Sequence, residues 1–256
     1  MSNDNNYPGS WPGGPKSKDE FEETCIHLSQ NLFNFKRNPI FCAVINNDGR
    51  GFSHAKEMYN VIEEKCPDLL KIENLNKFTE NDKIGNPPKV YEFNNVNISP
   101  GTIIFMKVLS DIYNFENVNS IVEIGTGYGG QCKIIKDYLD VNYTCVDNSG
   151  CLTLCKSYLK KMNVEAEFVE SDNVPNITTD LVISNYCLSE LDNNGIDFYF
   201  EKIIKNSKYI YFTLSDFNED NRRYAHLLKR CKELFDVQLF PIHKNHPNYI
   251  ISGIKK

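Results

Sequence analysis

The sequence predicts an α/β protein whose core is a doubly wound, mostly parallel sheet of seven strands that closes with an antiparallel hairpin. From Asn119 onward, short apolar runs alternate with helical patterns, as in strand–helix units of a parallel sheet. Closely spaced glycines directly follow the first run, Ile121–Ile124. The last two runs are joined by a short polar loop with no room for a crossover helix, so we expect them to pair as a hairpin.

Composition and charge narrow the class of protein. The chain has 256 residues, of which 41% are apolar, and a net charge of −6 with lysines scattered among acids, which disfavours nucleic acid as the main partner. No apolar run approaches the roughly 18 residues that a transmembrane helix needs, and no signal peptide is visible. The nine cysteines, an odd number, favour free thiols. We therefore expect a cytoplasmic protein without a membrane partner.

The N-terminal part divides into a tail and a cap. Residues 1–18 are rich in Gly, Pro, Asn and Ser, which predicts a disordered tail. Residues 19–115 predict a mainly helical cap. Its expected helices begin at Glu20, after the N-cap Ser53, and after Ser99-Pro100, with a shorter one over Asp68–Phe78. Asn46–Gly49 predicts a turn.

Residues 116–256 form the predicted core. Four of its helices centre on Ile134, Leu154, Tyr199 and Leu227. Its seven expected strands are Ile121–Ile124, Tyr143–Val146, Ala166–Val169, Leu181–Ser184, Tyr209–Leu214, Val237–Pro241 and Tyr249–Ile254.

The glycine-rich turn after the first strand predicts a site for an adenine nucleotide. Glycine permits positive φ and close backbone approach, and the following helix offers free N–H groups at its N-terminus. The turn residues that we expect to contact the ligand are Gly125, Thr126, Gly127, Tyr128 and Gln131.

Polar residues at the ends of later strands complete this predicted site. Asp147 ends the second strand, 20 residues beyond Gly127, where a carboxylate can bind ribose hydroxyls. The other expected contacts follow the second, third and fourth strands: Asn148, Ser171, Asp172, Asn185 and Tyr186. Asp180 lies at the opposite edge, where we expect a structural role.

Two cofactors compete for the glycine-rich turn. Gly125, Gly127 and Gly130 formally satisfy the dinucleotide fingerprint, which is weak evidence alone. Glu123 argues against it, because a carboxylate would face a pyrophosphate badly but suits the positively charged amino-acid end of S-adenosylmethionine (SAM). A dehydrogenase would also need a substrate domain after the sheet. SAM is the favoured cofactor.

Two segments resemble a known family. Glu123–Gln131 resembles the glycine-rich motif of class I SAM-dependent methyltransferases, which have a Rossmann-like fold. Ser184–Leu191 is similar to the Ser-Asn-Tyr-Ala-Phe-Ser-Glu-Leu signature of the sugar O-methyltransferase family, from which it departs at Cys187 and Leu188. Gly85-Asn86-Pro87 and Ser99-Pro100 also resemble that family; Thr126 departs from it.

The resemblance implies a SAM-dependent enzyme that methylates a hydroxyl of a sugar, sugar nucleotide or glycan. Two alternatives stay open. One is a methyltransferase for another small metabolite with an oxygen or nitrogen acceptor. The other is a catalytically silent SAM-binding module.

A hydroxyl acceptor calls for a general base. Glu190, within the family signature, is the first candidate, with a structural carboxylate as the alternative; Asp192 is the other carboxylate of that loop. His246 and His243 in the hairpin loop follow, either as bases or as exposed loop histidines.

Three further residues are candidates on the substrate side: Asn86, Tyr91 and Asp216. For Asn86 and Tyr91, a turn residue and a core aromatic are equally good interpretations. Cys151 and Cys155 share a helix face with apolar residues, which predicts buried thiols. No metal is expected.

Overall fold

The computed structural model describes residues 17–45, 50–215, 222–244 and 246–256. The chain forms two compact units. The first consists of residues 1–114, 127–139 and 148–165, and the second of residues 115–126, 140–147 and 166–256. The predicted tail lies outside the described residues except for Ser17, which caps the first helix, and Lys18, which begins it. These two residues therefore belong to a helix and not to a tail.

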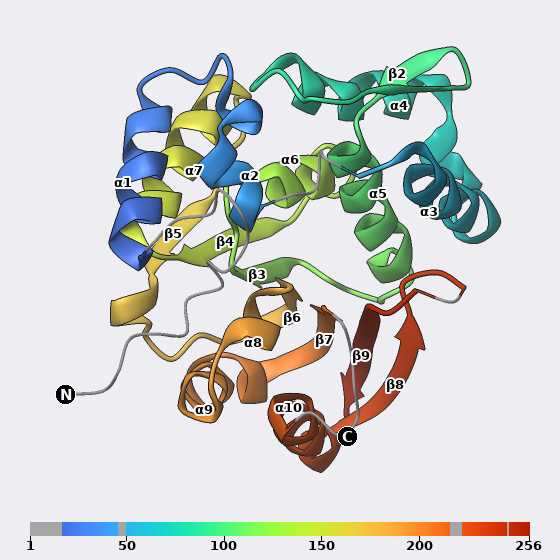
Figure 1. The fold of residues 1–256 in the computed structure, drawn as a ribbon. Coiled ribbons are helices and arrows are strands. Elements are labelled where there is room, and N and C mark those ends of the chain that lie inside the picture. The colour runs from blue at the N-terminus through green and yellow to red at the C-terminus, as the bar shows by residue number, and fades with distance from the viewer. Residues whose placement is uncertain (1–16, 46–49, 216–221, 245) are drawn as a thin grey trace. The chain divides into compact units, whose positions relative to one another are not determined.

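The first unit is mainly helical (Figure 1). Its helices are α1 (Lys18–Ser29), α2 (Pro39–Val44), α3 (Phe52–Lys65), α4 (Ile72–Phe78), α5 (Pro100–Ile112), α6 (Gly130–Lys136) and α7 (Ser149–Lys161). Helix α1 packs against α7, and α5 packs against both α3 and α6. A small antiparallel hairpin, β1 (Tyr91–Phe93) and β2 (Val96–Ile98), turns through two asparagines. Asn94 and Asn95 both have positive φ, which is the backbone of a tight two-residue hairpin turn.

Two N-terminal expectations need correction. Helix α3 begins at Phe52 after Gly51, so Ser53 is inside the helix and is not its N-cap. The helix expected over Asp68–Phe78 is interrupted, because Lys71 has an extended backbone between a 3₁₀ turn and α4. The helix after Ser99 is confirmed, and the Ser99 side chain accepts from the Thr102 N–H as its cap. The turn expected at residues 46–49 lies outside the described residues.

The second unit holds a seven-stranded sheet in the order β5-β4-β3-β6-β7-β9-β8. The strands are β3 (Ser120–Ile124), β4 (Asn142–Asp147), β5 (Glu167–Glu170), β6 (Thr179–Asn185), β7 (Ser207–Leu214), β8 (Phe235–Pro241) and β9 (Tyr249–Lys255). Strand β9 is antiparallel to both of its neighbours, and every other pairing of adjacent strands in this sheet is parallel. The predicted strands and the closing hairpin are confirmed.

The core of the second unit lies between the sheet and its helices. Helices α9 (Asn193–Lys202) and α10 (Arg222–Leu234) lie side by side, and α10 also packs against β8 and β9 (Figure 1). Val182, Ile210 and Phe212 from the central strands are fully buried there. Burying such a side chain contributes about 1.5–3 kcal/mol. Among the described helices, none combines the length and apolar character that a membrane crossing requires.

The topology brings chemistry-bearing residues to one edge of the sheet. Strand β3 has β4 on one side and β6 on the other, so the chain reverses its strand order there. Open α/β sheets bind ligands at the carboxyl ends of strands beside such a reversal. Strand β8 runs in the same direction as β7, so the connection between β8 and β9 lies at this edge too. We call this the carboxyl edge.

Asp180 lies at the opposite edge and has the predicted structural role. Its Oδ2 accepts hydrogen bonds from the N–H groups of Asn119 and Ser120, both at 2.9 Å, and from the Ser120 hydroxyl at 3.0 Å. Burial opposes ionisation of this carboxyl, but these donors outweigh it and lower its pKa. Asp180 therefore fixes the start of β3.

Replacing Asp180 by Asn is expected to lower the free energy of unfolding at pH 7 by about 1–3 kcal/mol, because charge-assisted hydrogen bonds are lost. A lowered folded-state pKa gives stability that is present above the unfolded value of about 3.9 and is lost as the pH falls through the folded value. Urea denaturation of both proteins at pH 7 and pH 3 measures this. An equal difference at both pH values would contradict the charge-based role.

Candidate functional site

Glu123 is a buried carboxyl at the carboxyl edge. It occupies the second-last position of β3 and is 2% exposed. The Tyr143 hydroxyl donates to its Oε2 at 2.9 Å, and Asn185 is a further hydrogen-bond partner. Burial raises the pKa of Glu123 well above its usual value, and Cys145 and Asp147 raise it further. Ionised Glu123 thus needs a cation nearby.

Two other carboxyl groups share this environment. Asp147 ends β4, and Glu190 ends the short helix α8 (Cys187–Glu190). The Glu190 residue is exposed, yet desolvation by the surrounding protein, followed by the charge of Asp147, raises its pKa to about 7. Burial raises the pKa of the Cys187 thiol, and the charge of Asp147 raises it further. The carboxyl edge therefore gathers three carboxyl groups, and a positively charged ligand would favour their ionised forms.

A sharp turn links β6 to α8. Tyr186 lies between them with φ 72°, a left-handed backbone that non-glycine residues rarely adopt. Its N–H donates to Thr213 O at 2.8 Å, and its carbonyl accepts from the Ser189 hydroxyl. The Leu188 N–H donates to the Ser184 hydroxyl at 3.3 Å. The stretch Ser184–Leu191 is thus a strand end, a strained turn and one helical turn, and Glu190 is the last residue of that helical turn.

The first glycine of the turn after β3 permits a close backbone approach. Gly125 has φ 82°, and a Cβ there would lie 2.3 Å from the Cβ of Cys187. Its N–H donates to Val146 O at 2.8 Å, while the Thr126 hydroxyl donates to Glu123 O at 3.2 Å. No side chain fits at position 125, so α8 sits directly against this backbone. A glycine is required here for the fold of the site itself.

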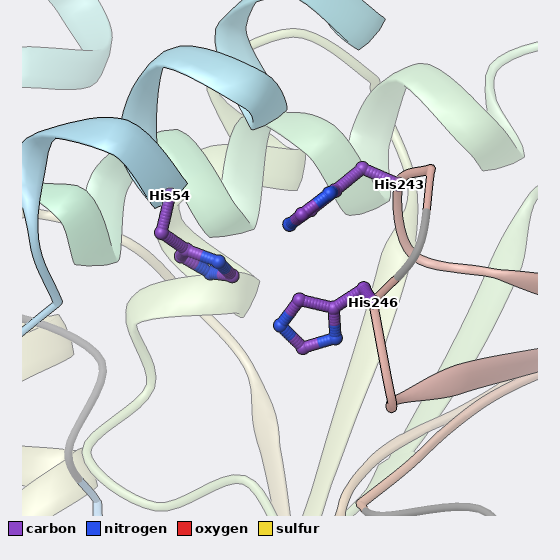
Figure 2. A group of neighbouring side chains, drawn as sticks. All are labelled: His54, His243 and His246. Carbon is purple, nitrogen blue, oxygen red and sulfur yellow. The ribbon is translucent and has the colours of Figure 1, made fainter.

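The histidines of the hairpin loop lie at the same edge (Figure 2). The rings of His243 and His246 are 4.6 Å apart. The Nδ1 of His246 accepts from the Asn248 N–H at 3.0 Å, and the Asn248 amide donates to the Tyr186 hydroxyl at 3.4 Å. Because Nδ1 is already an acceptor, the neutral His246 ring carries its proton on Nε2. Its basic nitrogen is therefore already engaged, which favours Glu190 as the base. His54, also drawn, comes from the first turn of α3 in the other unit.

Several predicted cofactor contacts belong to the first unit. Gly127 has a positive φ of 58°, as the glycine-rich turn requires. The Tyr128 and Gln131 side chains are buried, and Gln131 donates to Phe105 O at 3.1 Å. The Asn148 side chain caps α7 by accepting from the Cys151 N–H at 2.8 Å. The side chains of Tyr128, Gln131 and Asn148 are therefore packed or hydrogen-bonded within the first unit. Any ligand contact at these three positions would be made by backbone atoms.

The remaining predicted site residues of the second unit are a serine and three aspartates. Ser171 and Asp172 form a 3₁₀ turn directly after β5, at the carboxyl edge as expected. Asp192 accepts from the Gly195 N–H at 2.8 Å and caps α9, so it has a structural role. Asp216 lies outside the described residues.

The two candidates from the N-terminal region have structural contacts of their own. Asn86 has φ 53° and donates to the Asn34 side chain at 2.8 Å. The Tyr91 hydroxyl donates to Arg50 O at 3.3 Å, and its ring packs edge-on against Phe52. Both contacts fit the turn and core interpretations, and a substrate role stays a prediction.

The predicted burial of two cysteines is confirmed. Cys151 and Cys155 are both buried, and the Sγ of Cys151 lies 4.0 Å from the Sγ of Cys25. Both residues lie on α7 with their thiols inside the packed unit.

Sequence reasoning missed Tyr143 as a partner of Glu123. Tyr143 pairs with Ile121 across the parallel strands β3 and β4, so it shares a sheet face with Glu123 two positions on. A polar hydroxyl on that face beside a buried carboxyl was the available signal. Tyr143 therefore belongs with Glu123 at the carboxyl edge of the second unit.

Comparisons with known proteins add a likeness of fold. No family model and no curated protein matches the chain. Three of the solved structures that match are a methyltransferase from Pyrococcus furiosus, the mitomycin 7-O-methyltransferase MmcR, and the N-terminal domain of EvdMO1 in the presence of SAH and D-fucose.

The measures of these likenesses are low. The P. furiosus protein is 14% identical with a TM-score of 0.47, over 66% of this chain and 86% of that one. MmcR is 13% identical with a TM-score of 0.45, over 60% of this chain and 57% of that one. The EvdMO1 domain is 11% identical with a TM-score of 0.45, over 72% of this chain and 96% of that one.

Proposed function

We propose that this chain is a SAM-dependent O-methyltransferase whose acceptor is a hydroxyl of a sugar, sugar nucleotide or glycan. The observation that carries the proposal is the group of three carboxyls, Glu123, Asp147 and Glu190, at the carboxyl edge beside the strand-order reversal. Burial, and after it the charge of Asp147, raises the pKa values of Glu123 and Glu190, and a positively charged ligand would favour their ionised forms.

The charge pattern favours SAM over a dinucleotide. A pyrophosphate would bring further negative charge to Glu123 and Asp147, whereas SAM carries a sulfonium and an ammonium group. The positive φ of Gly125 supports the same proposal, because it turns the chain sharply at the end of β3, as a glycine-rich motif does, with Cys187 packed against the Gly125 backbone. These residues fit the group: Glu123 would hold its cationic amino-acid end, and Asp147 would hold its ribose hydroxyls.

SAM would supply a methyl group on a positively charged sulfur. In our proposal the protein contributes a base and alignment. Glu190 would take the proton of the acceptor hydroxyl as that oxygen receives the methyl group. A base with a pKa of about 7 is half deprotonated at neutral pH, which suits proton abstraction there.

The sugar class rests on the resemblance of Ser184–Leu191 to the sugar O-methyltransferase signature. That stretch contains the strained turn at Tyr186 and the proposed base Glu190, so the resemblance covers residues at the proposed centre of the chemistry. Calorimetric titration with SAM, followed by mass spectrometry of methyl addition over a panel of sugar nucleotides and glycans, tests the proposal. Absence of SAM binding overturns it. Binding with transfer only to other metabolites overturns the sugar class, and binding without any transfer indicates a silent module.

A further inference from the structure

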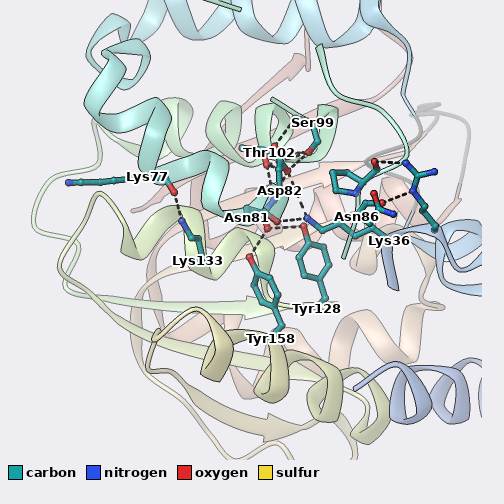
Figure 3. A network of polar contacts seen from close by, with 12 residues as sticks. Lys36, Lys77, Asn81, Asp82, Asn86, Ser99, Thr102, Tyr128, Lys133 and Tyr158 are labelled. Carbon is teal, nitrogen blue, oxygen red and sulfur yellow. Dashed lines mark hydrogen bonds and ion pairs between the residues drawn. The ribbon is translucent and has the colours of Figure 1, made fainter. Parts of the chain in front are cut away.

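Tyr128, in the middle of the glycine-rich turn, faces the interior of the first unit. Its ring is 2% exposed and folds back over the start of α6 (Figure 3). A Cβ at Gly130 would lie 2.6 Å from the Tyr128 hydroxyl oxygen and 2.4 Å from the Phe105 ring. The ring therefore lies directly on the Gly130 backbone, and movement of either one requires movement of the other.

The Tyr128 hydroxyl donates a hydrogen bond to a buried asparagine from a distant part of the chain. Asn81 is 0% exposed and lies in the 3₁₀ turn Thr79–Lys83. Its Oδ1 accepts from the hydroxyl of Tyr128 at 3.2 Å and from that of Tyr158 at 2.6 Å, while its Nδ2 donates to the Thr102 hydroxyl at 2.7 Å. Asn81 thus connects the glycine-rich turn, α7 and α5 through one side chain (Figure 3).

A buried charge pair fixes Asn81 in turn. Lys36 is 1% exposed; its Nζ donates to Asn81 O at 2.7 Å and lies 3.9 Å from Asp82. The same ammonium lies 5.1 Å from the centre of the Tyr128 ring, within cation–π range. Asp82 accepts from the Ser99 N–H at 2.7 Å and from the Thr102 hydroxyl at 2.7 Å. A network this fully hydrogen-bonded resists rearrangement.

We propose that the hydrogen bond from Tyr128 to Asn81 makes Asn81 a positioning residue, which holds the glycine-rich turn in the backbone conformation that SAM requires. The inference rests on the proposed function for its ligand. It extends that function by assigning a role in cofactor binding to the segment around Asn81, which carries no cofactor motif. The turn has positive φ at Gly127 and Gly129, and because glycine adopts negative φ about as readily, contacts from outside the turn are needed to select this one conformation.

The chain offers a matched pair of variants for the test. Tyr128→Phe and Tyr158→Phe each remove one hydroxyl that donates to the same Asn81 oxygen, and both rings are buried. Only Tyr128 belongs to the glycine-rich turn. We expect Tyr128→Phe to raise the Kd for SAM about five- to tenfold, and Tyr158→Phe to change it less than twofold, although thermal unfolding shows both proteins destabilised.

Hydrogen exchange of the protein without ligand provides the second readout. The amides of Gly129 and Gly130 are expected to exchange faster in Tyr128→Phe than in Tyr158→Phe. Equal effects of the two variants on the Kd, or equal exchange at these amides, would overturn the proposal. If the unaltered protein binds no SAM, the proposed function fails, and the exchange comparison alone decides whether the contact positions the turn.

Discussion

Replacing Glu190 by Gln is expected to lower kcat for methyl transfer by about 10²–10⁴-fold, the usual contribution of a positioned base. Glutamine keeps the shape of the side chain but cannot take the acceptor's proton. The Kd for SAM should change much less, because the raised pKa leaves Glu190 partly protonated and uncharged near neutral pH. Steady-state kinetics with calorimetry on the same preparations measures both quantities.

The pH profile sharpens this test. The base form of Glu190 is required, so kcat/KM should rise with pH through about 7 and then level off, while the profile of kcat should lie at lower pH because bound SAM lowers the pKa of Glu190. Asp192→Asn is the matched control, since Asp192 lies two residues on and Asn is also a good N-cap for α9. It should keep near-normal kcat and the same profile. An unchanged rate in the Glu190 variant would instead assign the base to His246.

Replacing Glu123 by Gln is expected to raise the Kd for SAM by about ten- to a hundredfold, or 1.4–2.8 kcal/mol. A buried carboxylate beside the cationic end of the ligand is lost, while the hydrogen bond with Tyr143 can persist. SAM affinity of the unaltered protein should increase with pH, because ionised Glu123 binds the cation and the protonated form does not. In the variant this dependence should become weaker. Calorimetry between pH 6 and pH 9 measures it.

The same substitution should stabilise the ligand-free protein at neutral pH. A carboxyl whose folded pKa is raised makes the native state less stable as the pH rises above the unfolded value of about 4.3. Glutamine removes that cost, and a gain in stability with a loss of binding is typical of a residue kept for function. Glu170→Gln, an exposed acid opposite Asp147 in the register, is the control and should change neither property much. Loss of stability without loss of binding would contradict a role for Glu123 in binding SAM.

The sheet could be predicted from the sequence because its signals are local. Each strand of the second unit is an apolar run with a definite end, and the short loop before Tyr249 allows only a hairpin. The interruption of the helix at Lys71 could not be predicted, because no proline or glycine marks it within Asp68–Phe78. The start of α3 was also missed, because Ser53 is an attractive cap that the chain does not use.

The candidate site was predictable where residues end strands. Asp147 and Asn185 follow from the position of their strands alone. The inward orientation of Tyr128 did not follow from the sequence, because side-chain direction in a glycine-rich turn depends on φ values that the sequence leaves open. Asn81 lies in a 3₁₀ turn without periodicity, and its partners are up to 77 residues away. Long-range polar networks leave no pattern in a single sequence.

Calorimetric titration of the intact protein with SAM, in two buffers of different ionisation enthalpy, tests the central claim most directly. We predict a single binding site and release of protons on binding at pH 7, because the cationic ligand lowers the pKa values of Glu123 and Glu190. S-adenosylhomocysteine, which lacks the sulfonium charge, should release fewer protons. No binding of SAM, or tighter binding of a nicotinamide dinucleotide, would contradict the account.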